Sequence, residues 1–496
     1  MTDAARPPRL SLLLALLLCQ LAGCALQPLQ ARADLPAQRS DARPASRLVA
    51  QHLSVVGRDG RLDAAARTRL LDRLALQGGG GLLNRQLAAM ADLGEVDLYA
   101  HNQARLLIDG PATFAAMFEA IAQARQTVLL QSYIIEDSVI ARRLALLLAQ
   151  QRANGVAVAV LYDALGSMGT DSAFFAALRE AGIPTCAINP LSPLKRPGYW
   201  NITERDHRKI LSVDRDIGFT GGINISGVYA SGSFGRQRPT PRTIAAPAPA
   251  GSPAGAAAGI SNGWRDTQVR LRGPAVAALD DLVRDTWLAQ GCEGQLAPPP
   301  ASRSAAAPAG SQSAEQVVRI VPSSPGDASN RIYTLLLTAI DASQRSVYLT
   351  MAYFAPGQEM VDALCDAARR GVDVQLVLPS LSDFSPVLHA GRSHYQRLLD
   401  AGVRLHELQD AVLHAKTAVI DGVVSTVGSS NMDWRSFASN SEVNAVVLGE
   451  DFGDAMTRMF RQDLAASSAI DAAAWAQRPL LQRAKQDLAR WFERLW

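Results

Sequence analysis

The pattern of apolar and polar residues predicts helices and strands that alternate along the chain. A helical segment around Phe118 and Ile121 leads into the apolar run 128–135, which has the length and composition of a buried strand. Far downstream, Ile340 lies in a similar helical segment that leads into a second apolar run, 347–354. Helices and strands that alternate in this way predict an α/β fold.

The two stretches continue in parallel, so the pattern repeats. Gly155-Val156 and Gly371-Val372 each precede a further apolar strand. After the next helix, Ala181-Gly182-Ile183 corresponds to Ala401-Gly402-Val403. Glycine at these positions lets the end of a helix reverse into a strand. The sequence therefore predicts a duplicated fold with an α/β sandwich in each half.

The N-terminus has the pattern of a bacterial export signal. Arg6 and Arg9 precede an apolar stretch, 10–18, that is too short to cross a bilayer. Leu21-Ala22-Gly23-Cys24 resembles a lipobox, in which the cysteine is lipidated and becomes the new N-terminus. We expect a membrane-anchored lipoprotein of the cell envelope that faces the periplasm, with the outer membrane as one location; an ordinary cleaved signal or an uncleaved anchor is the alternative.

Length and low-complexity stretches divide the chain further. With 496 residues, the chain is long enough for two domains and tails. The predicted segments are a signal peptide (1–23), a tether with a helical segment (24–95), a first half (96–297) with a low-complexity insertion at about 240–262, a linker (298–315), a second half (316–475) and a C-terminal amphipathic helix (476–496).

Charge and cysteine content narrow the function. The net charge of +3 provides no global basic field of the kind that marks a dedicated nucleic-acid binder. Apart from Cys24 and Cys19 of the signal, the cysteines are Cys186, Cys292 and Cys365, an odd and scattered set. This set predicts neither a disulfide framework nor a zinc site.

A polar motif stands in an apolar frame on the third strand of each half. The two copies are His207-Arg208-Lys209-Ile210-Leu211-Ser212-Val213-Asp214 and His414-Ala415-Lys416-Thr417-Ala418-Val419-Ile420-Asp421. Alternation places histidine and lysine on one face of a strand, where both can meet one anion. Ten residues after each aspartate stands an asparagine, Asn224 or Asn431, in a turn suited to donate to phosphate oxygens.

Two copies with identical spacing closely resemble the phospholipase D superfamily, whose pattern is H-x-K-x4-D-x6-G-[GS]-x-N. The resemblance covers about 96–475 and is strongest to bacterial cardiolipin synthases, through RDHRKILSVD, GFTGGIN, WRDTQVRLRGPAV and GSSNMDWRSFASNSEVNAVV. It implies two α-β-α sandwich halves with mixed sheets, packed around one active site on a pseudo-twofold axis. It also implies a covalent phosphohistidine intermediate and a reaction that needs no metal or other cofactor.

The resemblance assigns roles to residues of this sequence. His207 is expected to be the nucleophile and His414 the acid, an order that the sequence alone does not fix, while Lys209, Lys416, Asn224 and Asn431 hold the phosphate. By family position, Glu442 is expected to orient His414 and Asp266 to orient His207. Asp214 and Asp421 are signature residues of the catalytic motifs that we interpret as structural.

The expected activity is transfer of a phosphatidyl group between glycerophospholipids, with phosphatidylglycerol as acceptor and phosphatidylethanolamine as a further substrate. Hydrolysis by a phospholipase D is the alternative, and a periplasmic nuclease has less support.

Two segments could contact the membrane surface. The loop 190–200 is either a headgroup guide or a packed cover. The C-terminal helix, with Leu481, Leu488 and Trp491 between basic residues, is expected to dock on the domain, with anionic lipid as the alternative.

Overall fold

The computed structural model describes residues 53–78, 81–91, 96–191, 203–233, 263–300, 315–327 and 330–495. The signal peptide with Cys24, the low-complexity insertion and most of the loop 190–200 lie outside the described residues.

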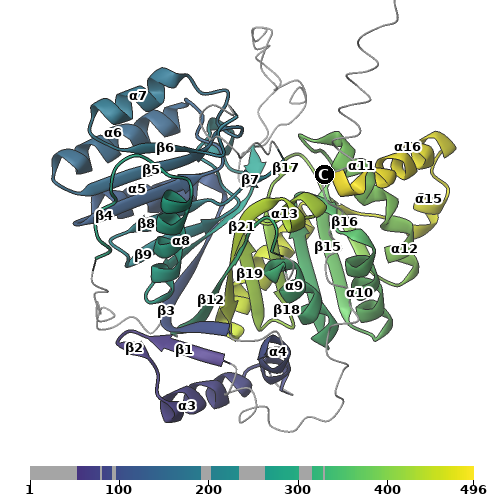
Figure 1. The fold of residues 1–496 in the computed structure, drawn as a ribbon. Coiled ribbons are helices and arrows are strands. Elements are labelled where there is room, and N and C mark those ends of the chain that lie inside the picture. The colour runs from purple at the N-terminus through teal and green to yellow at the C-terminus, as the bar shows by residue number, and fades with distance from the viewer. Residues whose placement is uncertain are drawn as a thin grey trace, which may run out of the picture.

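The predicted repeat is seen in two sheets that share one strand order (Figure 1). In the first half the neighbouring strands are, in order, β3 (Val96–Ile108), β11 (Thr267–Arg272), β9 (Ile217–Gly221), β8 (Ile210–Val213), β4 (Thr127–Ser132), β5 (Ala157–Asp163) and β6 (Thr185–Ile188). In the second half they are β12 (Gln316–Ser323), β21 (Asn440–Leu448), β19 (Val424–Gly428), β18 (Lys416–Ile420), β13 (Ser346–Met351), β15 (Asp373–Pro379), β16 (Arg404–Leu408) and β22 (Ser467–Ala469).

Both sheets are mixed in the same way. In each half the first five strands run antiparallel to their neighbours and the next two join in parallel. The two first strands, β3 and β12, pair with each other in antiparallel fashion, so the halves form one continuous sheet. The predicted fold class, a duplicated α/β fold with mixed sheets, is thereby confirmed.

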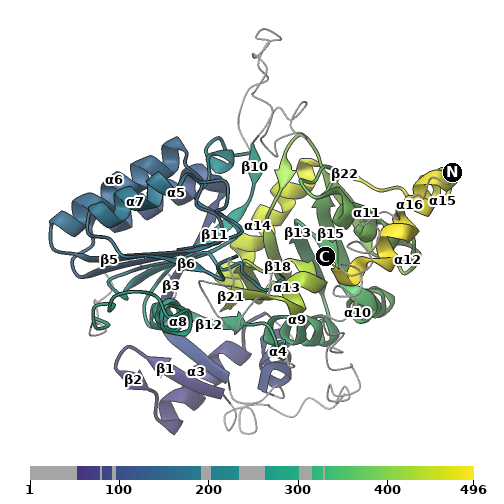
Figure 2. The ribbon, with the colours of Figure 1, turned by 45° about the horizontal axis from the view of Figure 1, so that its top comes forward.

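Helices cover both faces of each sheet. In the first half, α5, α6 and α7 lie on one face and α8 on the other (Figure 2). The bounds are α5 (Asp109–Ala122), α6 (Val139–Ala153), α7 (Ser172–Glu180), α8 (Ala275–Ala289), α9 (Arg331–Ala342), α10 (Gly357–Arg369), α11 (Ser385–Ser393), α12 (Tyr395–Asp400), α13 (Trp434–Ala438) and α14 (Glu450–Ala465). Every residue of β4 and β18 is buried, because helices cover both faces of each sheet.

A hydrophobic cluster joins the two halves. It combines side chains from α8, such as Val276 and Trp287, with side chains from α14, such as Met456, and with Val443 of β21. All four are almost fully buried. The halves therefore share a core and position their motifs against each other as one unit.

Residues 53–91 precede the repeat and pack against it. They form β1 (Leu53–Gly57), β2 (Gly60–Arg61), α3 (Ala64–Ala75) and α4 (Leu82–Ala91). Strand β1 extends the sheet beside β3, and Gln86 of α4 donates a hydrogen bond to the Ala339 carbonyl of α9 (3.0 Å). The described part of the region predicted to be a tether with a helical segment thus starts with strands, and it contributes Leu53 and Leu83 to the core of the second half.

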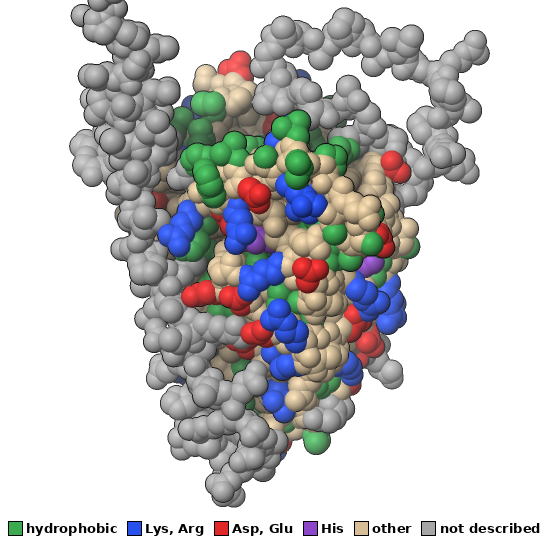
Figure 3. Space-filling model, turned by 90° about the vertical axis from the view of Figure 1, so that its right-hand side faces the viewer, with side chains coloured by type: hydrophobic (Ala, Val, Ile, Leu, Met, Phe, Trp, Pro, Cys, Tyr) green, Lys and Arg blue, Asp and Glu red, His purple; other side chains and the backbone are tan. Residues whose placement is uncertain are grey.

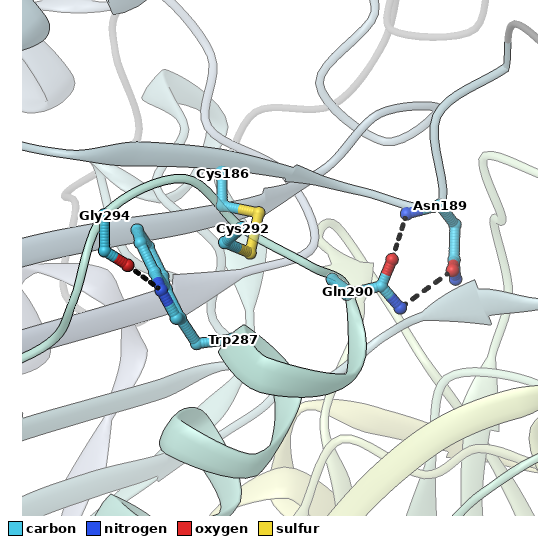
Figure 4. The surroundings of a disulfide bond; sticks show 6 residues. All are labelled: Cys186, Asn189, Trp287, Gln290, Cys292 and Gly294. Atoms are coloured by element: carbon cyan, nitrogen blue, oxygen red, sulfur yellow. Dashed lines mark hydrogen bonds between the residues drawn. A yellow bond between two sulfur atoms is a disulfide. The ribbon is translucent and has the colours of Figure 1, made fainter. Parts of the chain in front are cut away.

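A disulfide joins Cys186 on β6 to Cys292 just after α8 (Figure 4). The two cysteines are separated by 106 residues in the sequence, and their Cα atoms lie 5.6 Å apart. The prediction of no disulfide was wrong, because the pairing depends on the end of α8 meeting β6 across the fold. Cys365 is a free thiol buried in the core.

Candidate active site

Each of the two histidines directly follows a short strand that pairs with a strand of the other half. Strand β7 (Arg205–Asp206) pairs in parallel with the start of β21 in the second half. Strand β17 (Val412–Leu413) pairs in parallel with β10 (Trp264–Arg265) of the first half. The next residues in the motifs are His207 and His414, whose backbone N–H groups donate to the carbonyls of Ser441 (2.9 Å) and Arg265 (2.8 Å). Each motif is therefore fastened to the opposite half.

His207 is buried, and its Nδ1 atom is held by the second half. Nδ1 lies 3.1 Å from the Ser429 carbonyl oxygen and 3.1 Å from both carboxyl oxygens of Glu442. A carbonyl oxygen only accepts, so Nδ1 carries the proton and donates. Nε2 then keeps its lone pair, which is the form that a nucleophilic imidazole requires.

His414 is held by the first half in the corresponding way. Its Nδ1 lies 2.7 Å from the Asp266 carboxylate, 2.9 Å from the Lys416 ammonium and 3.2 Å from the Tyr229 hydroxyl. Asp266 is completely buried, so its negative charge acts on the imidazole with little screening. This carboxylate favours the protonated imidazolium.

The expected partnership of carboxylates and histidines was wrong. Glu442 orients His207, and Asp266 orients His414, the reverse of the assignment made from family position. The strand register gives the reason. Ser441 faces Asp206 and Arg265 faces Leu413, so the following residue in each strand lies beside the histidine of the other half.

The two lysines of the motifs are buried beside the histidines. Lys209 donates to the His207 carbonyl (2.6 Å) and lies 5.2 Å from the centre of the Tyr133 ring. Lys416 donates to the His414 carbonyl. Burial lowers the pKa of Lys209 to about 7 and that of Lys416 to about 8. Two cations with few fixed anionic partners are suited to receive a phosphate dianion or diester.

Electrostatics distinguish the two histidines. Burial lowers the pKa of His207 well below its ordinary value, and the charges of Lys209 and Lys416 lower it further. Burial also lowers the pKa of His414, but the Asp266 carboxylate opposes that shift. Burial raises the pKa of Glu442 to about 7, while the Lys209 charge opposes this rise. The site is therefore asymmetric, with the neutral form favoured more strongly at His207 than at His414.

The two asparagines differ in their contacts. The Asn224 amide accepts from the Ile134 N–H (3.1 Å) and donates to the Tyr229 hydroxyl (3.2 Å). The Asn431 side-chain oxygen is buried without a hydrogen-bond partner among the described residues. Asn224 thus fixes the tyrosine that contacts His414, whereas Asn431 retains a free acceptor.

Asp214 and Asp421 lie at the opposite ends of their strands from the histidines. The Asp214 carboxylate accepts from the N–H groups of Arg125, Gln126 and Thr127 (2.7–2.9 Å), and Asp421 accepts from the corresponding N–H groups that lead into β13. Both residues have positive φ angles, 52° and 54°. Their carboxylates therefore hold the turns before β4 and β13, and neither residue contacts a motif histidine in the structure.

Comparisons with known proteins place this geometry in a family. Residues 336–464 match the family model described as cardiolipin synthase, PLD-like domain. The chain is 31% identical to cardiolipin synthase of Geobacillus thermodenitrificans over 80% of this chain and 73% of that protein. It is 34% identical to cardiolipin synthase A of Pseudomonas aeruginosa over 77% of this chain and 71% of that protein.

The chain belongs to the cardiolipin synthase family of the phospholipase D superfamily. The resemblance inferred from the motifs is thus confirmed, and the chain is an enzyme of the phosphatidyltransferase type. Its fold is also similar to that of phosphatidylserine synthase from Haemophilus influenzae, with a TM-score of 0.57 and 12% identity over 83% of this chain and 98% of that protein.

Several residues near the cardiolipin synthase-like site were not predicted from the sequence. Tyr229 lies on the short helix η2 (Gly227–Tyr229) and contacts His414, as described above. The Tyr133 ring lies 4.9 Å from the His207 ring, and the charge of Arg435 on α13 lowers the His207 pKa. Arg435 stands four residues after Asn431, inside a block already recognised as family-like, so its position was a signal that could have been used.

Proposed function

We propose that the chain forms cardiolipin by transferring a phosphatidyl group from one glycerophospholipid to the free hydroxyl of phosphatidylglycerol. The observation that carries this proposal is the pair of buried histidines, each with Nδ1 held by a carboxylate from the other half and with Nε2 left for chemistry. Two buried lysines beside them supply the positive charge that a phosphodiester needs.

The first step uses the asymmetry of the histidines. Nε2 of His207 attacks phosphorus, and the bond from phosphorus to the leaving alcohol oxygen breaks. That oxygen takes the electron pair and receives the proton of the His414 imidazolium. The contact between Asp266 and His414 (2.7 Å) supports this role, because the carboxylate stabilises the charged acid.

The second step reverses the roles of proton donor and acceptor. His414, now neutral, takes the proton from the hydroxyl of phosphatidylglycerol, and the hydroxyl oxygen attacks phosphorus. The P–N bond breaks and returns its electron pair to His207. Lys209 and Lys416 stabilise the negative charge on the non-bridging oxygens in both steps. Water in place of the lipid hydroxyl would give the hydrolytic reaction of a phospholipase D.

Product analysis tests this proposal. Purified protein is mixed with vesicles of phosphatidylglycerol, with and without phosphatidylethanolamine, and the lipids are identified by mass spectrometry. We expect cardiolipin from the wild type and none from His207→Ala or His414→Ala. Phosphatidic acid as the only product would replace the synthase by a hydrolase, and no change in the lipids would contradict both.

We further propose that the chain works outside the cytoplasm, on the periplasmic side of a bacterial envelope. The disulfide between Cys186 and Cys292 supports this location independently of the N-terminal signal, since disulfides persist in oxidising compartments. Near the disulfide, Gln290 accepts from the Asn189 N–H (3.1 Å) and donates to its side chain (3.1 Å; Figure 4). The bridge thus anchors the start of the segment that leads to His207.

We expect reduction of this disulfide to destabilise the protein. A bridge that closes a loop of this length typically stabilises a fold by about 2–4 kcal/mol, which for a protein of this size corresponds to a fall in Tm of about 2–5 °C. Thermal unfolding of protein purified from the periplasm, with and without reductant, measures the change. The Cys186→Ser variant is the control, because its Tm should not respond to reductant. Alkylation of Cys186 and Cys292 without prior reduction would contradict the bridge.

A further inference from the structure

The C-terminal helix α16 (Leu480–Trp491) docks on the second half through its polar face. Gln486 is completely buried, and Ala489 packs against Val387 and Ala390 of α11. Glu493 of η3 (Glu493–Leu495) accepts from the Gly357 N–H (2.9 Å) and contacts His394 (3.1 Å). Gln486 and Ala489 are three residues apart and so lie on one side of α16, and Glu493 of the following η3 adds its contacts just beyond the helix end.

The apolar face of α16 points away from the protein. Exposed fractions are 80% for Leu480, 71% for Leu481, 55% for Leu488, 83% for Trp491 and 43% for Phe492. An amphipathic helix that docks on a domain normally buries this face, as the sequence analysis expected. Helix α16 docks on the domain, but in the opposite orientation. Five large apolar side chains are therefore exposed to water. Such a patch marks an interaction surface.

Basic residues flank this apolar face. Arg483, Lys485 and Arg490 lie on α16 and Arg494 lies on η3, with Asp487 and the buried Glu493 among them. Arg490 donates to Gln358 (3.1 Å) and Arg494 lies over the Trp434 ring, while Lys485 is exposed. Figure 3 views the side on which α16 lies and shows hydrophobic side chains gathered at the upper end of this face, above lysine and arginine side chains among which acidic side chains also lie. Apolar side chains beside cations fit the interface of an anionic bilayer.

The apolar face also lies on the active-site side of the molecule. In Figure 1, α16 and α11 are at the same end as β7 and β17, which lead into His207 and His414. Helix α11 follows Asp383, which accepts from the Tyr353 hydroxyl (2.7 Å) and whose charge reaches His414. The neighbouring Phe384 and Leu381 are exposed by 39% and 46%. Both side chains lie in the turn between β15 and α11, the helix against which α16 packs, so this turn adds exposed apolar side chains beside Asp383.

We propose that the apolar face of α16, with its flanking basic residues, is the surface on which the protein rests on an anionic phospholipid bilayer. In this position the active-site mouth opens toward lipid headgroups, so a substrate reaches the histidines without leaving the membrane. The inference deepens the proposed function by naming the contact through which the lipid substrate is supplied. Binding at α16 does not require turnover, so it is testable separately.

A local probe on α16 tests this surface. The full chain carries His207→Ala, to prevent lipid turnover, and Cys19→Ser and Cys24→Ser, so that a polarity-sensitive fluorophore attaches only at Leu488→Cys. Cys365 is buried and the other two cysteines form the disulfide. On mixing with vesicles of phosphatidylglycerol and phosphatidylcholine, we expect a several-fold rise in fluorescence with a blue shift. The rise should be weaker with phosphatidylcholine alone.

The matched control places the same fluorophore at Leu76→Cys. Leu76 is exposed by 82% and caps α3, which lies at the opposite end of the molecule from α16 (Figure 1). No rise is expected there, and the double substitution Leu481→Ser and Trp491→Ser should remove the rise at Leu488→Cys. An equal rise at both positions, or none at Leu488→Cys, would overturn the proposal. An equal rise with and without phosphatidylglycerol would overturn the requirement for an anionic surface. If the probe responds but the wild type makes no cardiolipin, only the proposed function fails.

Discussion

The His414→Ala variant should release one equivalent of leaving group from an activated phosphatidyl substrate and then stop. A p-nitrophenyl ester needs no proton on its leaving oxygen, so His207 can still attack and form the P–N bond without the acid. The covalent intermediate then persists, because no base activates the second alcohol. With natural lipids, where the acid is needed, turnover should fall on the order of 10⁴-fold or more.

The His207→Ala variant should show no burst with the same substrate, because the attacking nitrogen is absent. The burst is followed by p-nitrophenolate absorbance, intact-protein mass spectrometry detects the added phosphatidyl group, and mass spectrometry of the digested protein locates it on the His207 peptide. His389→Ala serves as the control, since His389 lies on α11 and is not held by a carboxylate in the structure. A label on His414, or a burst from His207→Ala, would exchange the roles of the two histidines.

The crossed carboxylates produce the second large effect. Asp266→Asn should lower kcat with natural lipids on the order of 10³-fold, because the carboxylate that stabilises the His414 imidazolium is replaced by a neutral amide. The same variant should keep its burst with the activated ester, since that step needs no acid. Glu442→Gln, which weakens the hold on His207, should instead slow the burst itself.

These two variants control for each other, because both replace a completely buried carboxyl group of the same site by an amide. If each carboxylate served the histidine of its own half, the results would be exchanged: Asp266→Asn would lose the burst and Glu442→Gln would keep it.

The pH profile of activity gives a second readout. Activity should decline as pH rises, first as the His414 imidazolium, whose pKa burial lowers below its ordinary value, loses its proton, and then through about 7 to 8, where Lys209 and Lys416 lose their charge. In Asp266→Asn the decline should begin at lower pH, since Asp266 raises the pKa of His414.

Inverted docking of α16 and the crossed carboxylates share a physical cause that local sequence does not reveal. The amphipathic pattern identifies two faces of a helix, but which face meets the protein depends on what the protein offers. At α11 and its neighbours, His394 and the Gly357 N–H group are partners for Glu493, so the polar side is buried. The apolar side is left for a different environment.

The sequence by itself determined the duplicated α/β fold, the family and the chemical groups of the site. These follow from local patterns: apolar runs that are buried on both faces, glycines at helix ends, and two copies of one motif with equal spacing. The interpretation of Asp214 and Asp421 as structural also came from their place at the end of a strand, and the N–H groups that their carboxylates bind belong to the turn before a neighbouring strand.

Only the tertiary structure decided which groups meet across the molecule. The bond between Cys186 and Cys292, the contact of Glu442 with His207 and that of Asp266 with His414 join residues more than 100 positions apart. Such pairs depend on the register of strands exchanged between the halves, and a shift of one residue would turn each carboxylate to the other face of its strand. The same exchange breaks the symmetry of the repeat, because a glutamate serves one histidine and an aspartate the other.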